Sequence, residues 1–307
     1  MPLRSCSFAR RWPAFVFFLL AAFAHGVPAQ TTVAPGAVVI YPKSVSPTDS
    51  QYLYDYELLR LAIEKTNGTD GPLELRPSDV PMNQARAAEE IITGSGRIHI
   101  FARSTAIEHE QRMLPIRIPI DKGLISYRVF LIRAADQPRF AAVNTLDELR
   151  RFSVGSFTTW ADTKILRDGG FIVVTGDSYE GLFRMLVAGR FDFFSRGVDE
   201  AYREFEERRA ELPDMAVEES LLLYFPTTRY FFVQRSAAGE RLAARIERGL
   251  NRMIKDGSFN AHFRKYKGAL IEQAHLKTRK LFRIPNPYLS PETPLARREL
   301  WYDPLSE

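Results

Sequence analysis

Two arginines hold positions from which a guanidinium can bind an anion. Arg103 and Arg196 each lie at the carboxyl end of a predicted apolar strand. Open α/β sheets bind ligands at that end, and a guanidinium presents a planar fork of N–H donors that matches a carboxylate or phosphate. If the two strand ends face one gap, both arginines would close on one anion. A surface ion pair of Arg196 with Asp199 or Glu200 is the alternative interpretation.

Hydroxyl groups and an indole ring extend this candidate anion site. Ser104 follows Arg103, and Thr158, Thr159 and Trp160 open a predicted helix directly after a strand. Backbone N–H groups and hydroxyls at the positive end of a helix dipole bind anions, and a tryptophan offers a stacking face. An N-cap next to a core tryptophan is the alternative, since hydroxyls are common at N-caps.

Two tyrosines complete the candidate ligand-binding set. Tyr41 ends a predicted strand, and Tyr179 lies where a predicted helix opens. Each would line a cleft between two folded units or pack as an ordinary core aromatic.

Catalytic and metal chemistry has little support in the sequence. The histidines are scattered without ligand spacing, so we predict no metal and no cofactor. The single cysteine, Cys6, lies in a segment that we expect to be removed, which excludes thiol catalysis, thiolate metal sites and disulfides. Candidates for a general acid or base are restricted to Glu108, Asp162 and Glu200.

The elements that must position these side chains follow an α/β pattern. From Gly36 onward, short apolar runs alternate with helical patterns. The pattern restarts after an apolar strand over 127–132, so we predict a second α/β unit over about 135–220 and two segments that carry the chain back. Two such connections form a hinge. We therefore predict two lobes, each a mixed sheet flanked by helices.

Several helix ends are predicted from glycines. Asn67-Gly68 is expected to end a helix over 52–66, Gly257 to cap a helix over 240–256, and Gly268 to end a helix that begins at Ser258. A helix over 202–210, rich in arginine and glutamate, is predicted to be a solvated face.

The first 29 residues have the layout of a secretory signal peptide, with Arg4, Arg10 and Arg11 before an apolar stretch over 12–24. That stretch would rise only about 20 Å as a helix, short of the ~30 Å hydrocarbon core. The full chain has a net charge of +5. Removal of this segment takes away three arginines and no acid, so the near-neutral remainder gives no reason to expect a nucleic-acid partner. We expect a soluble monomer in the periplasm.

Three short motifs, in their order and spacing, resemble a known family. Asp256–Asn260 with Arg264–Gly268 is similar to a C-terminal helix pair, Val154–Thr159 resembles a ligand-contacting strand-to-helix turn, and Leu186–Asp192 resembles an "L-x-x-G-[KR]-x-D" segment. The family is the two-lobed periplasmic solute-binding proteins of the amino-acid-binding type, extracellular solute-binding protein family 3. The resemblance covers residues 36–270.

The resemblance implies a type II periplasmic-binding-protein-like fold with an inserted lobe. Its expected parts are a signal peptide over 1–29, lobe 1 over 30–132, lobe 2 over 133–223, a helical return to lobe 1 over 224–280, and an extended proline-rich tail over 281–307, pinned along one lobe.

Two departures from the family pattern bear on the ligand. The family's Thr-x-x-Arg clamp is missing, because Thr105 is followed three residues later by Glu108. Where the family usually has an acid for the ligand's ammonium group, this chain has Arg196-Gly197. An anionic or carboxylate-bearing solute is therefore a better expectation than an ordinary α-amino acid.

By this resemblance the chain is predicted to bind a small solute by hinge closure and to deliver it to an ABC-type permease. A membrane sensor is the alternative receiver. Two other classes stay open: a periplasmic enzyme similar to dehydratases of this fold, and an interaction protein without a ligand.

Overall fold

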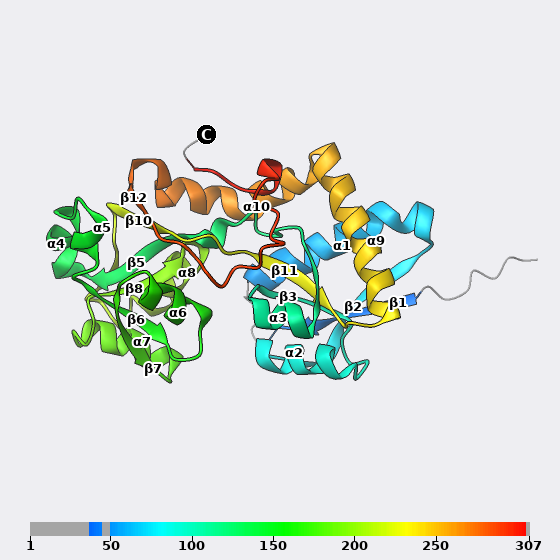
Figure 1. Cartoon of the computed structure of the whole chain (residues 1–307), viewed down its shortest axis with the longest axis horizontal. Coiled ribbons are helices and arrows are strands. Elements are labelled where there is room, and N and C mark those ends of the chain that lie inside the picture. Colours follow the sequence, from blue (N-terminus) through cyan, green and yellow to red (C-terminus); the bar gives the residue numbers. More distant parts are fainter. Residues whose placement is uncertain (1–36, 45–49, 305–307) are drawn as a thin grey trace, which may run out of the picture. The chain divides into compact units, whose positions relative to one another are not determined.

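The chain folds around two groups of β-strands (Figure 1). The structure is a computed structural model that describes residues 37–44 and 50–304. The predicted signal segment over 1–29 lies outside the described residues. Within them, no helix combines the length and apolar character needed to cross a membrane.

The first group of strands, with its helices, is called the first lobe. It contains a parallel pair, β1 with β2, and an antiparallel three-stranded sheet in the order β3-β11-β4. Its elements are β1 (Ala37–Lys43), α1 (Ser50–Asp70), β2 (Leu73–Pro81), α2 (Gln84–Thr93), β3 (Ile100–Ser104), α3 (Ile107–Arg112), β4 (Leu114–Ile116), β11 (Arg229–Val233) and α9 (Ala237–Asp256).

The second group, called the second lobe, is a mixed seven-stranded sheet in the order β12-β10-β5-β8-β6-β7, with β9 also paired to β5. Strand β6 runs parallel to β7 and β8, whereas β5 runs antiparallel to β8 and β10. Its elements are β5 (Tyr127–Arg133), α4 (Gln137–Ala141), α5 (Leu146–Leu149), β6 (Ser153–Phe157), α6 (Ala161–Asp168), β7 (Ile172–Gly176), α7 (Tyr179–Val187), β8 (Phe193–Gly197), α8 (Val198–Arg208), β9 (Met215–Val217), β10 (Leu221–Tyr224) and β12 (Lys280–Arg283).

Each lobe buries its own apolar core. The first lobe packs the apolar side of α1, including Leu58, Leu59 and Ala62, against Ile246 and Leu250 of α9. The second lobe has two buried clusters, and α10 (Ser258–Ala274) contributes to one of them while its start packs into the first lobe. Helix α10 therefore joins the two cores, in addition to the connections between the sheets.

Capping explains where several helices begin and end. The Thr145 hydroxyl accepts from the N–H of Glu148, whose carboxylate accepts from the N–H of Thr145, and this capping box begins α5. Gly257, with φ of 82°, ends α9 as predicted.

Two predicted helix ends are wrong. Helix α1 continues through Asn67-Gly68 to Asp70, because Arg245 of α9 donates to the Thr66 hydroxyl and to the side-chain carbonyl of Asn67. Helix α10 continues through Gly268, because Ile271 and Ala274 beyond it are buried. In each case tertiary contacts outweigh the helix penalty of a glycine, about 1 kcal/mol.

The chain passes between the sheets along residues 117–126, from β4 to β5, and along 225–228, from β10 to β11. The two segments are tied together, because the Ser126 hydroxyl donates to the carbonyl of Thr227 and accepts from its N–H. The predicted lobe boundaries stay a prediction. In the structure β5, β10 and β12 all belong to the seven-stranded sheet.

The residues after β12 are not confined to one lobe, contrary to the expectation for the tail. Tyr288 hydrogen-bonds Asp168 of α6, whereas Leu300 is buried in the core of the first lobe.

Candidate functional site

A cavity of about 660 Å³ is lined from both lobes. The first lobe contributes the end of β3 and the start of α3. The second lobe contributes β5, the turn before α6, and the facing ends of β8 and α8. The cavity brings together five of the predicted ligand-binding residues, which are Arg103, Ser104, Thr159, Trp160 and Arg196.

The guanidinium of Arg103 forms no ion pair with an acid in the described part of the chain. Arg103 lies in β3, where the register pairs it with Tyr230. Its Nε is buried without a hydrogen-bond partner among the described residues. Burial lowers its pKa to about 10, so the side chain is charged at neutral pH. Burial and the charge of Arg103 together lower the pKa of the adjacent His109 to about 4, which leaves that imidazole neutral.

The turn before α6 is held in place by side-chain hydrogen bonds. The Thr163 hydroxyl pairs with that of Ser156 and donates to the carbonyl of Phe157. The exposed Thr159 and the half-buried Trp160 line the cavity. Thr158 instead donates from its N–H and hydroxyl to the carbonyl of Gly176, and it lies outside the lining.

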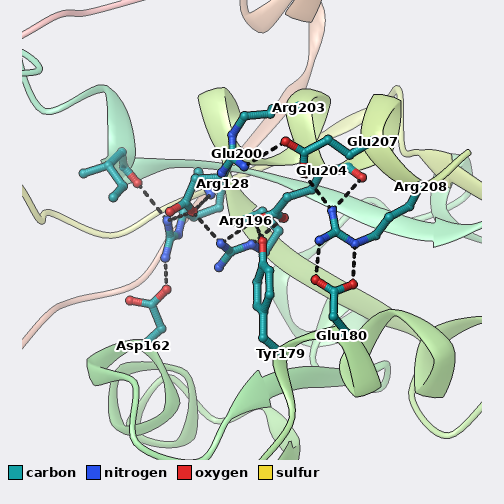
Figure 2. Close-up of polar contacts among 12 residues, drawn as sticks. Arg128, Asp162, Tyr179, Glu180, Arg196, Glu200, Arg203, Glu204, Glu207 and Arg208 are labelled. Atoms are coloured by element: carbon teal, nitrogen blue, oxygen red, sulfur yellow. Dashed lines mark hydrogen bonds and ion pairs between the residues drawn. The ribbon is translucent and has the colours of Figure 1, made fainter. Parts of the chain in front are cut away.

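Arg196 lines the cavity but is already engaged by protein (Figure 2). It is the last residue but one of β8 and so lies at the carboxyl end of that strand. Its Nε and Nη2 each donate to the carboxylate of Glu204 at 2.7 Å, and its Nη2 lies 3.2 Å from Glu200. Its guanidinium also stacks 4.5 Å from the ring centre of Trp160.

Glu204 corrects the prediction of a solvated helix face, because this residue of α8 is fully buried. Besides Arg196 it binds Tyr179, whose hydroxyl donates to it at 2.6 Å. Burial alone would lower the pKa of Arg196, but the charges of Glu200 and Glu204 raise it above its usual value. Tyr179 thus supports Glu204 and does not line the cavity.

Arg128 is a cavity residue that the sequence analysis missed. It lies in β5, 2% exposed, and its guanidinium forms an ion pair with Asp162 at the start of α6 (Figure 2). It also stacks 4.8 Å from the ring of Phe225. Burial lowers its pKa to about 10, an effect that Glu200 partly offsets. In the sequence, Arg128 is marked only as the one charged residue within the apolar run over 127–132.

A second arginine that was missed, Arg229, borders the cavity from β11. It is buried and donates twice to Asp55, at 3.1 and 2.7 Å. On its other side lies a smaller hollow of about 270 Å³, which also holds the predicted site residue Tyr41. Tyr41 is therefore a neighbour of the cavity and packs edge-on against Phe231.

The cavity lining and its ion-pair partners hold five basic and five acidic side chains, so what distinguishes the basic groups is which of them are paired. Arg128, Arg196 and Arg229 are each neutralised by a carboxylate. Arg103 and the exposed Lys164 also line it, and neither forms an ion pair with any acid of residues 37–44 and 50–304. Of the three acids that line the cavity, the exposed Glu108 forms no ion pair with a base among the described residues.

The arrangement suits binding better than catalysis. Two of the predicted acid or base candidates, Asp162 and Glu200, form ion pairs with arginines. Groups of three or more metal-ligand side chains do not occur in the described residues. The cavity offers hydroxyls, an indole ring and two basic groups, Arg103 and Lys164, that form no ion pair within the described residues.

Comparisons with solved structures agree with this architecture. An ancestral arginine-binding protein bound to arginine superposes with a TM-score of 0.52 at 15% identity, over 76% of this chain and 98% of that one. A histidine kinase sensor domain with similarity to periplasmic binding proteins gives a TM-score of 0.52 at 20% identity, over 77% and 97%. An arginine-specific periplasmic binding protein of Salmonella typhimurium gives 0.50 at 14% identity, over 75% and 98%.

Neither a scan against protein-family models nor a search of curated proteins finds a match. The structural likeness extends over nearly the whole length of each neighbour, and all three are binding or sensor proteins. This chain therefore has the mixed α/β, two-lobed fold of the periplasmic binding proteins.

Proposed function

We propose that this protein binds a small anionic or carboxylate-bearing solute in the cavity between its lobes. The observation that carries the proposal is Arg103, a half-buried guanidinium on the cavity wall that no acid of the described residues neutralises. A charged donor that lacks a partner is stabilised by an anionic ligand, because a hydrogen bond to a charged group contributes about 1.5–3 kcal/mol.

The groups around Arg103 fit the same ligand. Ser104 and Thr159 place hydroxyls in the cavity, and Lys164 adds a second positive charge. Binding of one solute by groups from both lobes favours the closed form, because only that form makes all the contacts.

The solved neighbours support solute binding as the general function, but two of them bind arginine, a cation with an α-ammonium group. In this cavity two of the three lining acids, Asp162 and Glu200, are already paired. We therefore expect carboxylates and other small anions to bind more tightly than basic amino acids.

The test is a binding screen by thermal unfolding, followed by titration calorimetry. The probes are mono- and dicarboxylates, inorganic phosphate, and neutral and basic amino acids. A solute at 100 times its Kd stabilises the fold by about 2.7 kcal/mol. Mass spectrometry of the recovered solute shows whether it is converted, which would favour an enzyme.

Arg103→Gln is the decisive variant, and Arg112→Gln is its matched control. Arg112 is a nearby exposed arginine that pairs with Glu89 on the surface. We expect R103Q to weaken binding of the anion by roughly 10- to 100-fold, which corresponds to 1.5–3 kcal/mol, and R112Q to leave it unchanged. Equal affinities for R103Q and the parent would contradict the proposal.

We further propose that the chain is exported to the periplasm and presents its solute to an ABC-type permease. The histidine kinase sensor domain among the neighbours makes a membrane sensor the other receiver to test. Transport of the identified solute into cells with and without this protein separates the two.

A further inference from the structure

The last described segment, residues 284–304, runs from the second lobe to the first. It begins at Ile284, directly after β12, where Ile284 is buried in a core of the second lobe. It reaches Leu300, which is fully buried in the core of the first lobe. Tyr302, two residues further on, is buried in a core of the second lobe, and its carbonyl accepts from the hydroxyl of Tyr127 in β5 at 3.3 Å. The segment is therefore anchored in both lobes.

Two contacts fasten the segment to the second lobe. The Tyr288 hydroxyl donates to Asp168 of α6 at 2.6 Å, and Lys164 of the same helix lies 5.7 Å from the centre of the Tyr288 ring. Tyr288 also lines the cavity. A residue from the end of the chain thus forms part of the cavity wall.

Further contacts fasten the segment to the first lobe and to the connection over 117–126. Glu292 forms an ion pair with Arg117 at 2.7 Å. The Tyr302 N–H donates to the carbonyl of Lys122 at 2.7 Å. The Trp301 ring lies against Gly123, where an added Cβ would come within 2.4 Å of the ring.

We propose that residues 284–304 act as a strap that limits how far the two lobes separate, and that Tyr288 is the point where the strap meets the cavity. Opening of the lobes would carry Asp168 away from Arg117, and the segment between Tyr288 and Glu292 is fixed to both. Opening therefore requires release of at least one of the two contacts.

The strap is tested by the distance between the lobes without any ligand. The sequence has one cysteine, Cys6, so a full chain with C6S carries no native thiol. Spin labels at A85C in α2 and R184C in α7, two exposed helix positions, report the separation of the lobes by double electron–electron resonance. We compare the labelled parent with Y288A/E292Q.

We expect Y288A/E292Q to shift the distance distribution to longer separations and to broaden it. The matched control is E299Q, which removes an ion pair between Glu299 and Arg297 inside the segment and should leave the distribution unchanged. If the double variant does not fold, Y288F/E292Q gives the same comparison, because it keeps the ring and removes both polar contacts.

A distribution for the double variant that coincides with that of E299Q would overturn the strap. Because no solute is added, this result does not depend on the proposed function. Failure of the binding screen would equally leave the strap intact.

Discussion

Arg103 and Arg196 lie at similar positions in their strands but differ in whether an acid of the protein pairs with them. Both line the cavity, but Arg196 has Glu204 as a buried bidentate partner, whereas Arg103 has no acid partner in the described chain. The sequence pattern identified both arginines as binding candidates. It could not separate them, because Glu204 lies eight residues away on a helix that was predicted to be solvated.

The buried pair between Arg196 and Glu204 sets a stability prediction. Replacement of Glu204 by Gln keeps the shape but removes the bidentate charge partner of the guanidinium and leaves only the longer ion pair with Glu200, so we expect a loss of about 3 kcal/mol in the free energy of unfolding. Urea denaturation measures it. E206Q on the same helix removes an exposed pair with Arg209 and should change stability by less than about 1 kcal/mol. Equal losses in the free energy of unfolding for the two variants would contradict this prediction.

Asp121 makes stability depend on pH. This carboxyl is 2% exposed in the connection over 117–126 and accepts hydrogen bonds from the N–H of Gly123 and the hydroxyl of Thr228. Burial raises its pKa from 3.8 to about 6, although Arg229 opposes the change. The fold thus favours the protonated form. Its contribution to stability is complete below about pH 4 and is lost as the pH rises through about 6.

The matching variant is D121N, which resembles the protonated acid at every pH. Because the pKa gap corresponds to about 3 kcal/mol, the stability of D121N relative to the parent should rise by that amount between about pH 4 and pH 6. Urea denaturation across this range measures it. D147N, at an exposed carboxyl paired with Arg150, should show no such rise. Parallel pH curves for parent and D121N would contradict the prediction.

At the scale of elements, helix and strand positions were largely predictable, because apolar spacing and capping residues act locally. The ends of α1 and α10 were not, since Arg245 and the burial of Ile271 act through contacts distant in sequence. Strand β12 was missed for the same reason. It pairs in parallel with β10, and this partner lies far away in the chain.

Replacement of two helix glycines by alanine is expected to change stability in opposite directions. A Cβ at Gly268 in α10 would meet no atom within 4 Å, whereas a Cβ at Gly249 in α9 would lie 2.1 Å from the carbonyl oxygen of Ala62. G268A should therefore stabilise the protein by about 1 kcal/mol through helix propensity. G249A should destabilise it, because α9 must move away from α1. Thermal unfolding measures both, and a stabilised G249A would disprove the close approach.

At the scale of the whole molecule, the two-lobed fold followed from the repeated α/β pattern and from the resemblance to periplasmic binding proteins. The course of the last segment did not, because its prolines predict extended chain without saying what that chain contacts. Tyr288 reaches the cavity through tertiary packing alone. The wall of the cavity therefore includes a residue that follows the next cavity residue in the sequence, Arg229, only after the whole of α9, α10 and β12.

The reciprocal hydrogen bonds between Ser126 and Thr227 have a mechanical result. The two connecting segments cannot separate at this point unless both hydrogen bonds break, so they move together there. Helix α10 and residues 284–304 also contact both lobes. A change in the angle between the lobes must therefore be accommodated by all of these segments together.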